Sequence, residues 1–587
     1  YKRMTVPTQS FIPGKDAPLE ATLNTLQTKL HSLGFHIEET NWRNPVDGVW
    51  SVQIRDRDCP LLSTHGKGAT RMACLASALG AFVERLATHY FWTPYYLGPD
   101  AAEQAFVHDP HERWFELTDN GAWPQALLNP ELHALYNPDS SIDCRHLVDF
   151  NSGHAARGIC AMPYVRQRDG RTTYFPVNII DNLYLSNGMA AGNTVAEART
   201  QALSEIVERY IKRKIISEGI CLPDVPESLI HRYPRIAAGI ATLRAAGFGV
   251  WVKDASLGGK YPVLNVTLLN PQDQGCFASF GAHPCFEVAL ERALTELLQG
   301  RDLDDLAGFA PPTFDLEEAA SATNIEIHFV DSTGVMHWEF LGEIPDHVFA
   351  DWNFASTTAQ DMAWLTQRIH DDGFDIYIAD FEHLGVYACR VLVPGMSEIY
   401  PVDDLDFENN SIANDMREAI LNLTELDNDE CAELLVSLNA SSLADQRSVA
   451  GVIGLAADAG SFWADLRVGE LKTLLALACG DEEATLEGCE WVRHFDQIAP
   501  QRRAVYACVE TLMQLTDFGD TAPYLSALRQ LFGAGVVAQA HALIMQTDRF
   551  MGISAPGLML QGCEMHHKLW AAYDKVQAHK RSASSRR

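Results

Sequence analysis

The pattern of apolar and polar positions changes near residue 400 and predicts two parts of different secondary structure. From about 60 to 400, helical periodicity alternates with short runs of alternating apolar and polar residues, which is typical of half-buried antiparallel strands. The expected strands are 173–180, 261–269, 276–280, 325–330, 375–380 and 386–393. Beyond about 410 the strand pattern fades and the periodicity is helical. The fold class expected is therefore α+β, with helices packed on mostly antiparallel sheet, followed by an all-α domain.

This change divides the chain into four expected regions. Residues 1–60 form an α/β lead-in to the main domain, which covers residues 61–400. Residues 410–578 are expected to pair as tetratricopeptide-like helical hairpins, and the basic end, 579–587, to be a disordered tail. A chain of 587 residues is longer than a single hydrophobic core usually serves, which supports the division.

Composition and charge exclude several classes of protein. The 45 basic against 77 acidic side chains give a net charge of −32, which argues against direct nucleic-acid binding because phosphates would be repelled. The 13 cysteines form no C-x-x-C pair, so the spacing of a zinc ribbon or an iron–sulfur site is missing, and free thiols fit a reducing compartment. The chain shows neither an apolar leader nor an uncharged run of membrane-spanning length. A cytoplasmic protein without membrane contact is expected.

Three segments repeat one polar stripe on an otherwise apolar helix. The first is 77–85 (SALGAFVER), the second 201–209 (QALSEIVER), and the third 291–301 (ERALTELLQGR). Positions i, i+4 and i+7 share one helix face, so each segment presents its polar groups together. A single copy would be interpreted as ordinary ion pairs on a solvent-exposed helix face. Repetition of the same spacing in three helices favours a functional site. Carboxylates beside arginines suit Mg²⁺ bridged to phosphates.

Other motifs are weaker. Gly66-Lys67-Gly68 lacks the Walker spacing and is interpreted as a glycine-rich turn that enters the first stripe. Asn193 is an N-cap candidate for the second helix, with Glu197 one turn later, and a plain cap and a nucleotide contact both stay open. His283 and the pair 566–567 have no companion ligands at a metal-binding spacing, so structural histidines are expected.

The three stripes and their surroundings resemble the YcaO family. That family builds its ATP site from an S-x-x-x-E-x-x-E-R motif, an E-x-x-E-R motif and a third helix that carries Arg, Glu and Gln. The likeness extends over nearly the whole chain and includes FIPGKD, GKGAT, NGMAAGNT, FASFGAHP and ADFEHLGVYACRVLVPGM.

The resemblance implies roles for individual residues, with ATP and Mg²⁺ as cofactors. It implies metal binding and catalysis by four glutamates, Glu84, Glu205, Glu208 and Glu296. It implies nucleotide binding by Lys15, Ser77, Glu84, Arg85, Asn193, Glu197, Arg209, Arg292 and Gln299, with Arg301 as a weaker candidate beside Gln299.

Two departures from the family pattern bear on function. Ala81 stands where the family's first motif has its leading Glu, so one carboxylate is missing from the first helix. The chain ends in QAHKRSASSRR, whereas azoline-forming members commonly end in a proline-rich tail. The second departure favours the branch of the family that assists modification of a ribosomal protein.

The resemblance implies an ATP-dependent enzyme that phosphorylates a backbone amide oxygen and releases ADP and phosphate. The implied role is assistance to β-methylthiolation of a small-subunit ribosomal protein, with that protein and its methylthiotransferase as partners and a homodimer as the assembly. Two alternatives stay open. One is a non-catalytic ATP-binding scaffold, which Ala81 supports. The other is an adenylate-forming ligase, which would release AMP and pyrophosphate.

Overall fold

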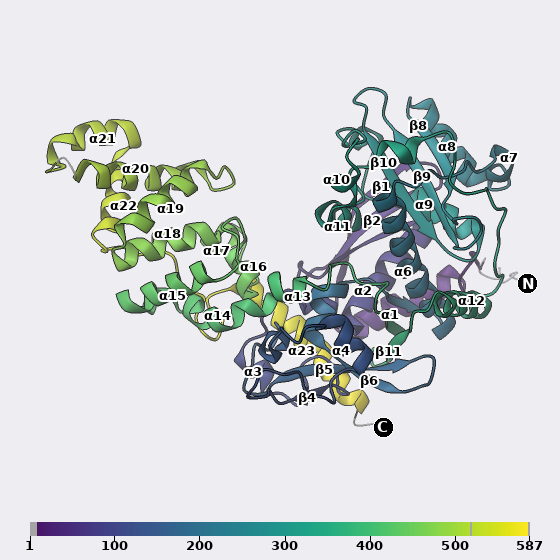
Figure 1. Ribbon diagram of the computed structural model, residues 1–587, viewed down its shortest axis with the longest axis horizontal. Helices are drawn as coiled ribbons and strands as arrows, with labels where there is room; N and C mark the ends of the chain where they lie inside the picture. Colours follow the sequence, from purple (N-terminus) through teal and green to yellow (C-terminus); the bar gives the residue numbers. More distant parts are fainter. Residues whose placement is uncertain (1–8, 517–518, 585–587) are drawn as a thin grey trace, which may run out of the picture.

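The computed structural model describes residues 9–516 and 519–584, and Figure 1 shows them as a mixed α/β body from which a helical arm projects. The body contains three antiparallel sheets. The first has the order β1-β2-β3, the second β10-β9-β8, and the third β4-β5-β11-β12-β7, with β6 also paired to β5. The expectation of helices on mostly antiparallel sheet is therefore confirmed.

The strands are β1 (Ile37–Val46), β2 (Val49–Asp56), β3 (Ser63–Gly68), β4 (Arg113–Phe115), β5 (Ile159–Arg166), β6 (Thr172–Pro176), β7 (Met189–Gly192), β8 (Gly249–Asp254), β9 (Val263–Leu269), β10 (Cys276–Ala282), β11 (Tyr377–Phe381) and β12 (Tyr387–Leu392). The principal helices of the body are α1 (Leu19–Ser32), α2 (Arg71–Ala87), α4 (Pro130–Tyr136), α6 (Val195–Glu218), α8 (Pro234–Ala245), α9 (Phe286–Leu297), α11 (Ala322–Val330) and α12 (Thr358–Asp371). Shorter helices are α3 (Pro99–Ala102), α5 (Val177–Ile179), α7 (Glu227–Ile230), α10 (Leu316–Ala320) and α13 (Asp404–Phe407).

Four of the six expected strands are confirmed, as β9 to β12, and one is wrong. Residues 325–330 belong to helix α11, not to a strand. Ser321 caps this helix by accepting a hydrogen bond from the Asn324 amide, and Asn324 and His328, four residues apart, are both buried. The apolar–polar alternation of 325–330 was therefore misleading, because a local cap and helical contacts on one face decide the structure.

Two other local predictions need correction. The strand expected over 173–180 ends at Pro176, after which the chain is helical from Val177. The segment Gly66-Lys67-Gly68 is not a turn but the end of strand β3, paired with β2.

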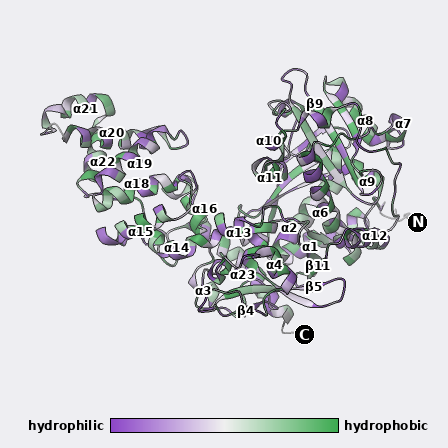
Figure 2. Ribbon diagram, in the orientation of Figure 1, coloured by the Kyte–Doolittle hydropathy of each residue, from purple (hydrophilic) through white to green (hydrophobic). Residues whose placement is uncertain are grey.

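The arm consists of α14 (Asn414–Leu421), α15 (Asn428–Ala440), α16 (Val449–Ile453), α17 (Phe462–Asp465), α18 (Val468–Cys479), α19 (Glu482–His494), α20 (Pro500–Thr516), α21 (Leu525–Phe532) and α22 (Ala534–Ile544). Its helices carry hydrophobic and hydrophilic residues side by side (Figure 2) and enclose a core of their own. Successive helices pack together, as α18 does with α19 and α19 with α20. The all-α region is confirmed, and its tetratricopeptide-like character stays a prediction.

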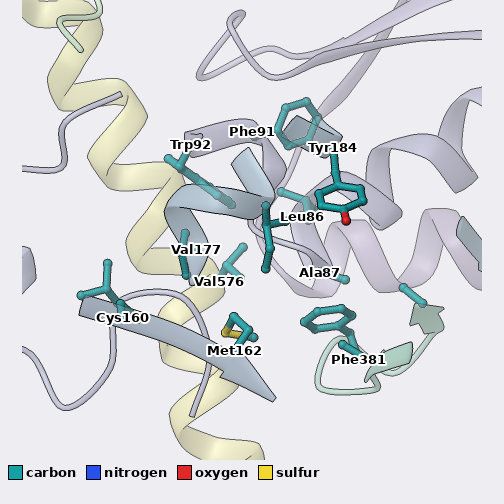
Figure 3. Close-up of a cluster of buried hydrophobic side chains, with 14 of the residues drawn as sticks. Leu86, Ala87, Phe91, Trp92, Cys160, Met162, Val177, Tyr184, Phe381 and Val576 are labelled. Atoms are coloured by element: carbon teal, nitrogen blue, oxygen red, sulfur yellow. The ribbon is translucent and has the colours of Figure 1, made fainter. Parts of the chain in front are cut away.

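The last helix, α23 (Glu564–Ser584), leaves the arm and returns to the body. Figure 3 shows Val576, on α23, among the buried side chains of Trp92, Met162 and Val177. The Trp92 indole donates a hydrogen bond to the Leu569 carbonyl at 3.3 Å. Although the region 410–578 was expected as one helical unit, its final helix therefore belongs to the core of the body.

The disordered tail expected over 579–587 is wrong as far as residue 584, where α23 ends. Lys580 is 1% exposed and donates a hydrogen bond to the His108 carbonyl. The helix continues because its inner face contacts the body, which the basic composition of the segment does not reveal. Residues 585–587 lie outside the described residues.

Helices α2, α6 and α9 each follow a strand that approaches them closely at a glycine. A Cβ at Gly66 of β3 would lie 2.3 Å from the Cys74 carbonyl oxygen of α2. A Cβ at Gly192 of β7 would lie 2.8 Å from the backbone nitrogen of Ala198, and one at Gly281 of β10 2.4 Å from the Ala289 carbonyl oxygen. Because only glycine fits, these contacts determine the position of all three helices.

Gly66→Ala is expected to lower the free energy of unfolding by about 1–3 kcal/mol, because the added methyl group must push α2 away from β3. Gly80→Ala is the matched control, since Gly80 lies on α2 with nothing within 4 Å of an added Cβ. That variant should gain up to about 1 kcal/mol of helix propensity. Urea unfolding followed by circular dichroism measures both, and equal effects of the two substitutions would contradict the packing argument.

Candidate functional site

The N-terminal end of α6 brings together three of the predicted nucleotide-binding residues around one buried carboxylate. Glu197 is 4% exposed. Its oxygens accept hydrogen bonds from Lys15 Nζ at 3.2 Å and from Asn193 Nδ2 at 2.9 Å, and also from the Asp16 amide at 3.0 Å. The cap of α6 is Thr194 rather than Asn193, because the Thr194 hydroxyl accepts the Glu197 amide hydrogen bond. The Asn193 side chain therefore orients Glu197.

The middle of α6 carries the second motif. Arg209 forms an ion pair with Glu205 and donates a hydrogen bond to Asn187 Oδ1 at 3.0 Å. Its guanidinium also lies 4.5 Å from the centre of the Phe329 ring. Glu208, one turn after Glu205, accepts a hydrogen bond at Oε2 from the Ala282 amide at 3.1 Å, which connects α6 to the end of β10. Burial raises the pKa of the Glu208 carboxyl above its ordinary value.

Glu84 on α2 faces the second motif. Burial raises the pKa of Glu84 to about 8, and the negative charge of Glu205 contributes in the same direction. The cations of Arg85, Arg209 and Arg390 offset part of this effect. A bound cation would lower the pKa of a carboxyl in such surroundings, because the cation stabilises the ionised form.

The third motif reaches the same place from α9. Arg292 donates hydrogen bonds to the Ala282 carbonyl at 3.0 Å and to the Gln201 side chain, so it joins α9 to α6. Glu296 forms an ion pair with Lys67 of β3. Burial lowers the pKa of Lys67 to about 8, with partial compensation by Glu208.

Sequence reasoning missed Lys67, which it treated as part of a turn. Glycines on both sides of a lysine allow a strand to pack against a helix on one side and present the lysine on the other, but the same three residues also suit a turn. Gly66 and Gly68 both contact α2, and Lys67 points instead to Glu296.

Other predicted residues lie at the edge of this site or away from it. Arg85 donates a hydrogen bond to the Ser63 carbonyl at 3.4 Å, and its guanidinium stacks on Tyr90. The guanidinium therefore binds groups other than the site carboxylates. Arg301 donates to the Asp331 carbonyl at 3.1 Å and stacks on Phe277. Ser77 is exposed on α2, two turns before Glu84, and Gln299 follows the end of α9.

Two of the three histidines, His283 and His566, make structural contacts, whereas His567 is exposed and stacks on Trp570. The buried His566 accepts the Ala456 amide at 3.0 Å and bonds the Tyr96 carbonyl oxygen at 2.8 Å. His283 accepts the Cys285 amide at 2.9 Å. Both rings therefore connect segments of backbone.

The donor atoms fit Mg²⁺ and phosphate chemistry. Glu84, Glu205, Glu208 and Glu296 supply hard oxygen ligands, and Arg209, Arg292 and Lys67 supply donors for phosphate oxygens. In the described part of the chain, no three acidic, histidine or cysteine side chains already form a metal-ligating group. Glu205 and Glu296 are instead paired with cations, so metal binding requires Arg209 and Lys67 to exchange partners.

A hollow of about 60 Å³, open to solvent, lies beside two of these carboxylates, Glu208 and Glu296. Glu208, Arg209 and Glu296 form one wall, and α11 with the segment after β12 forms another. In the described residues, no helix is both long and apolar enough to cross a lipid bilayer.

Two family models match the chain. Residues 65–397 match the model described as YcaO cyclodehydratase, ATP- and Mg²⁺-binding, and residues 413–582 match the YcaO cyclodehydratase C-terminal domain. The chain belongs to the YcaO family, and its main domain is of the ATP- and Mg²⁺-binding type.

Two relatives are similar over their whole length. The chain is 48% identical to the ribosomal protein S12 methylthiotransferase accessory factor YcaO of Escherichia coli (strain K12), over 97% of this chain and 98% of that protein. It is 46% identical to a protein of Haemophilus influenzae, over 98% and 99% of the two chains. A solved structure of YcaO from Methanopyrus kandleri, bound with AMPPCP and Mg²⁺, is 18% identical with a TM-score of 0.41, over 69% of this chain and 96% of that one.

Without metal and nucleotide, Glu84 should make stability fall as pH rises. The unfolded chain loses this proton near pH 4.5 and the folded chain near pH 8, so between these values the folded state binds more protons. The unfolding free energy contributed by Glu84 then decreases by up to about 1.4 kcal/mol per pH unit.

Glu84→Gln removes this dependence. Relative to the parent chain, its unfolding free energy should rise between pH 5 and pH 8 by on the order of 2 kcal/mol. The control is Glu218→Gln, which changes an exposed carboxylate at the end of α6. Urea unfolding in EDTA at the two pH values measures the difference, and parallel behaviour of Glu84→Gln and the control would contradict the raised pKa of Glu84.

Proposed function

We propose that this chain uses Mg·ATP to phosphorylate a backbone amide oxygen, with release of ADP and phosphate, in support of β-methylthiolation of a small-subunit ribosomal protein. The observation that carries the proposal is the meeting of four glutamates with Lys67, Arg209 and Arg292 between α2, α6 and α9. The name of the E. coli relative supplies the ribosomal protein S12 and its methylthiotransferase as partners.

The proposed site has an order along α6. Lys15, Asn193 and Glu197 at the N-terminal end would bind the nucleoside. Eleven residues further along, about 16 Å at the rise of an α-helix, Glu208 would bind metal next to the phosphates. Arg209, Arg292 and Lys67 would hold phosphate oxygens and balance negative charge as it moves during transfer.

The chemistry follows from the weakness of an amide oxygen as a leaving group. After a nucleophile has added to the carbonyl carbon, transfer of a phosphoryl group from ATP to this oxygen would release ADP, and the C–O bond could then break with phosphate as the leaving group. The task of the protein is to hold the groups in line and to exclude competing water. The four carboxylates come from three helices, and this suits the task because strand contacts fix the backbone of each helix.

A second candidate function is a non-catalytic ATP-binding scaffold, and Ala81 is the observation that favours it. Ala81 lies on α2 one turn before Glu84, so a Glu there would add a carboxylate to the same face. In this candidate function the arm would bind partners, and nucleotide would act as a structural ligand. A homodimer and a cytoplasmic location are part of either proposal.

Glu205→Gln and Glu208→Gln should each weaken Mg·ATP binding by about tenfold or more, because each removes a charged oxygen ligand while keeping the side-chain shape. Glu218→Gln, on the same helix, should leave the affinity unchanged within about twofold. Isothermal titration with Mg²⁺ and a nonhydrolysable ATP analogue measures these affinities. Unchanged affinity in both site variants would overturn the site assignment.

Ala81→Glu tests the missing carboxylate. If position 81 lies beside the metal, the variant should bind Mg²⁺ more tightly and release ADP at least about tenfold faster, while Ala81→Gln, of the same size but neutral, should not. Separation of the nucleotide products distinguishes ADP with phosphate from the AMP with pyrophosphate of a ligase. Identical rates for Ala81→Glu and Ala81→Gln would show that a carboxylate at position 81 does not contribute to metal binding or turnover.

A further inference from the structure

Residues 14–16, here called the strap, lie ahead of α1 and contact two separate parts of the candidate site. Gly14 packs on the buried ring of His283, which lies between β10 and α9. Lys15 and Asp16 contact the N-terminal end of α6, where the candidate nucleoside contacts lie. The conformation of the strap therefore determines the position of the Lys15 ammonium group.

The side chain of Asp16 fixes the strap to two helices. The Thr358 hydroxyl, at the start of α12, donates to its two carboxylate oxygens, which lie 2.8 and 2.9 Å away. The hydroxyl of Thr194, the N-cap of α6, donates to the same carboxylate. A negative charge is favourable here, because the N-terminal ends of both helices carry partial positive charge.

The main chain of the strap adds a third attachment. The Asp16 amide donates a hydrogen bond to Glu197 Oε2 at 3.0 Å, and Lys15 Nζ donates to Glu197 Oε1 at 3.2 Å. The side chain of Lys15 is 34% exposed. A lysine side chain with this exposure keeps much rotational freedom unless its backbone is held. The hydrogen bonds of Asp16 therefore restrict the positions that the Lys15 ammonium can occupy.

Gly14 supports the strap from the side of α9. Its φ is +76°, a conformation that favours glycine, and an added Cβ would lie 3.1 Å from His283 Nε2 and 3.7 Å from Val288 of α9. The His283 ring is 2% exposed, and its Nδ1 accepts the Cys285 amide at 2.9 Å, so the ring has little room to move. A larger residue at position 14 would therefore displace the strap.

From these contacts we propose that Gly14 and Asp16 are positioning residues for nucleoside binding, which hold Lys15 beside Glu197 before the nucleotide binds. The inference rests on the proposed function and adds a preformed contact at the nucleoside end of the site. Binding then costs little side-chain freedom, because Lys15 is already in place. The strap acts on the nucleoside and leaves the affinity for the phosphates unchanged.

The test compares two ligands on the full chain by isothermal titration with Mg²⁺. A nonhydrolysable ATP analogue contains the nucleoside, whereas tripolyphosphate supplies phosphates without it. Lys15→Met should weaken binding of the analogue by about tenfold, and Asp16→Ala and Gly14→Ala by about three- to tenfold each. Binding of tripolyphosphate should stay within about twofold of the parent chain, whereas a general disturbance of the site would weaken both ligands.

Two comparisons separate positioning from other effects. Gly170→Ala is the matched control for Gly14→Ala, because Gly170, between β5 and β6, has a φ of +72° but nothing within 4 Å of an added Cβ. It should leave both affinities unchanged. Asp16→Ala is also combined with Lys15→Met. Since Asp16 acts through Lys15, the double variant should bind the analogue as Lys15→Met does, within about twofold.

Equal losses for the two ligands, unchanged analogue binding in Asp16→Ala, or additive losses in the double variant would overturn the positioning role of Asp16. Equal effects of Gly14→Ala and Gly170→Ala would overturn that of Gly14, because backbone strain alone would then account for them. Failure of the parent chain to bind either ligand with Mg²⁺ would instead overturn the proposed function itself.

Discussion

The site depends on three places where a helix packs on a strand without an intervening Cβ. At Gly66, Gly192 and Gly281 the strand backbone contacts the backbone of the following helix, so α2, α6 and α9 are held at distances that a larger residue would not permit. Each helix then presents its polar stripe away from its strand. The three polar stripes lie next to one another because each is positioned by its own strand–helix pair, β3–α2, β7–α6 and β10–α9.

This arrangement places many charges in surroundings with little water. Glu84 and Glu208 have raised pKa values, and Lys67 has a lowered one, because burial disfavours the charged form of each group. Ion pairs with Arg209 and Lys67 neutralise two of the carboxylates when no metal is bound. The same cations are suited to phosphate oxygens, so in the proposed function Mg·ATP would exchange ion-pair partners within this network. Ala81, one turn before Glu84, contributes no carboxylate to it.

Sequence reasoning recovered the parts of this site that are periodic. The spacing of polar residues along the sequence is sufficient to find the stripes in 77–85, 201–209 and 291–301. The alternation of apolar and polar residues likewise predicts strands β9 to β12. It failed where a cap just outside the segment and the burial of one helix face decide the structure. The alternation in 325–330 predicted a strand, but the Ser321 cap and the buried Asn324 and His328 make it helix α11.

Lys67 was missed for a related reason. Its partner Glu296 is 229 positions away, and nothing local in Gly66-Lys67-Gly68 distinguishes a strand from a turn. The residue itself is ordinary, and the fold provides its chemical setting.

Helix α23 gives the helical arm a mechanical link to the site. It starts at the arm and ends in the body, where Leu569, Tyr573 and Val576 share a core with Leu86 and Ala87 at the end of α2. Tyr573 donates a hydrogen bond to the Val107 carbonyl at 2.8 Å, and Lys580 is buried against His108. Since α2 carries Glu84 one turn before this contact, α23 packs against the same helix that carries a site carboxylate. The chain that forms the arm therefore ends in the same hydrophobic core that positions α2 and Glu84.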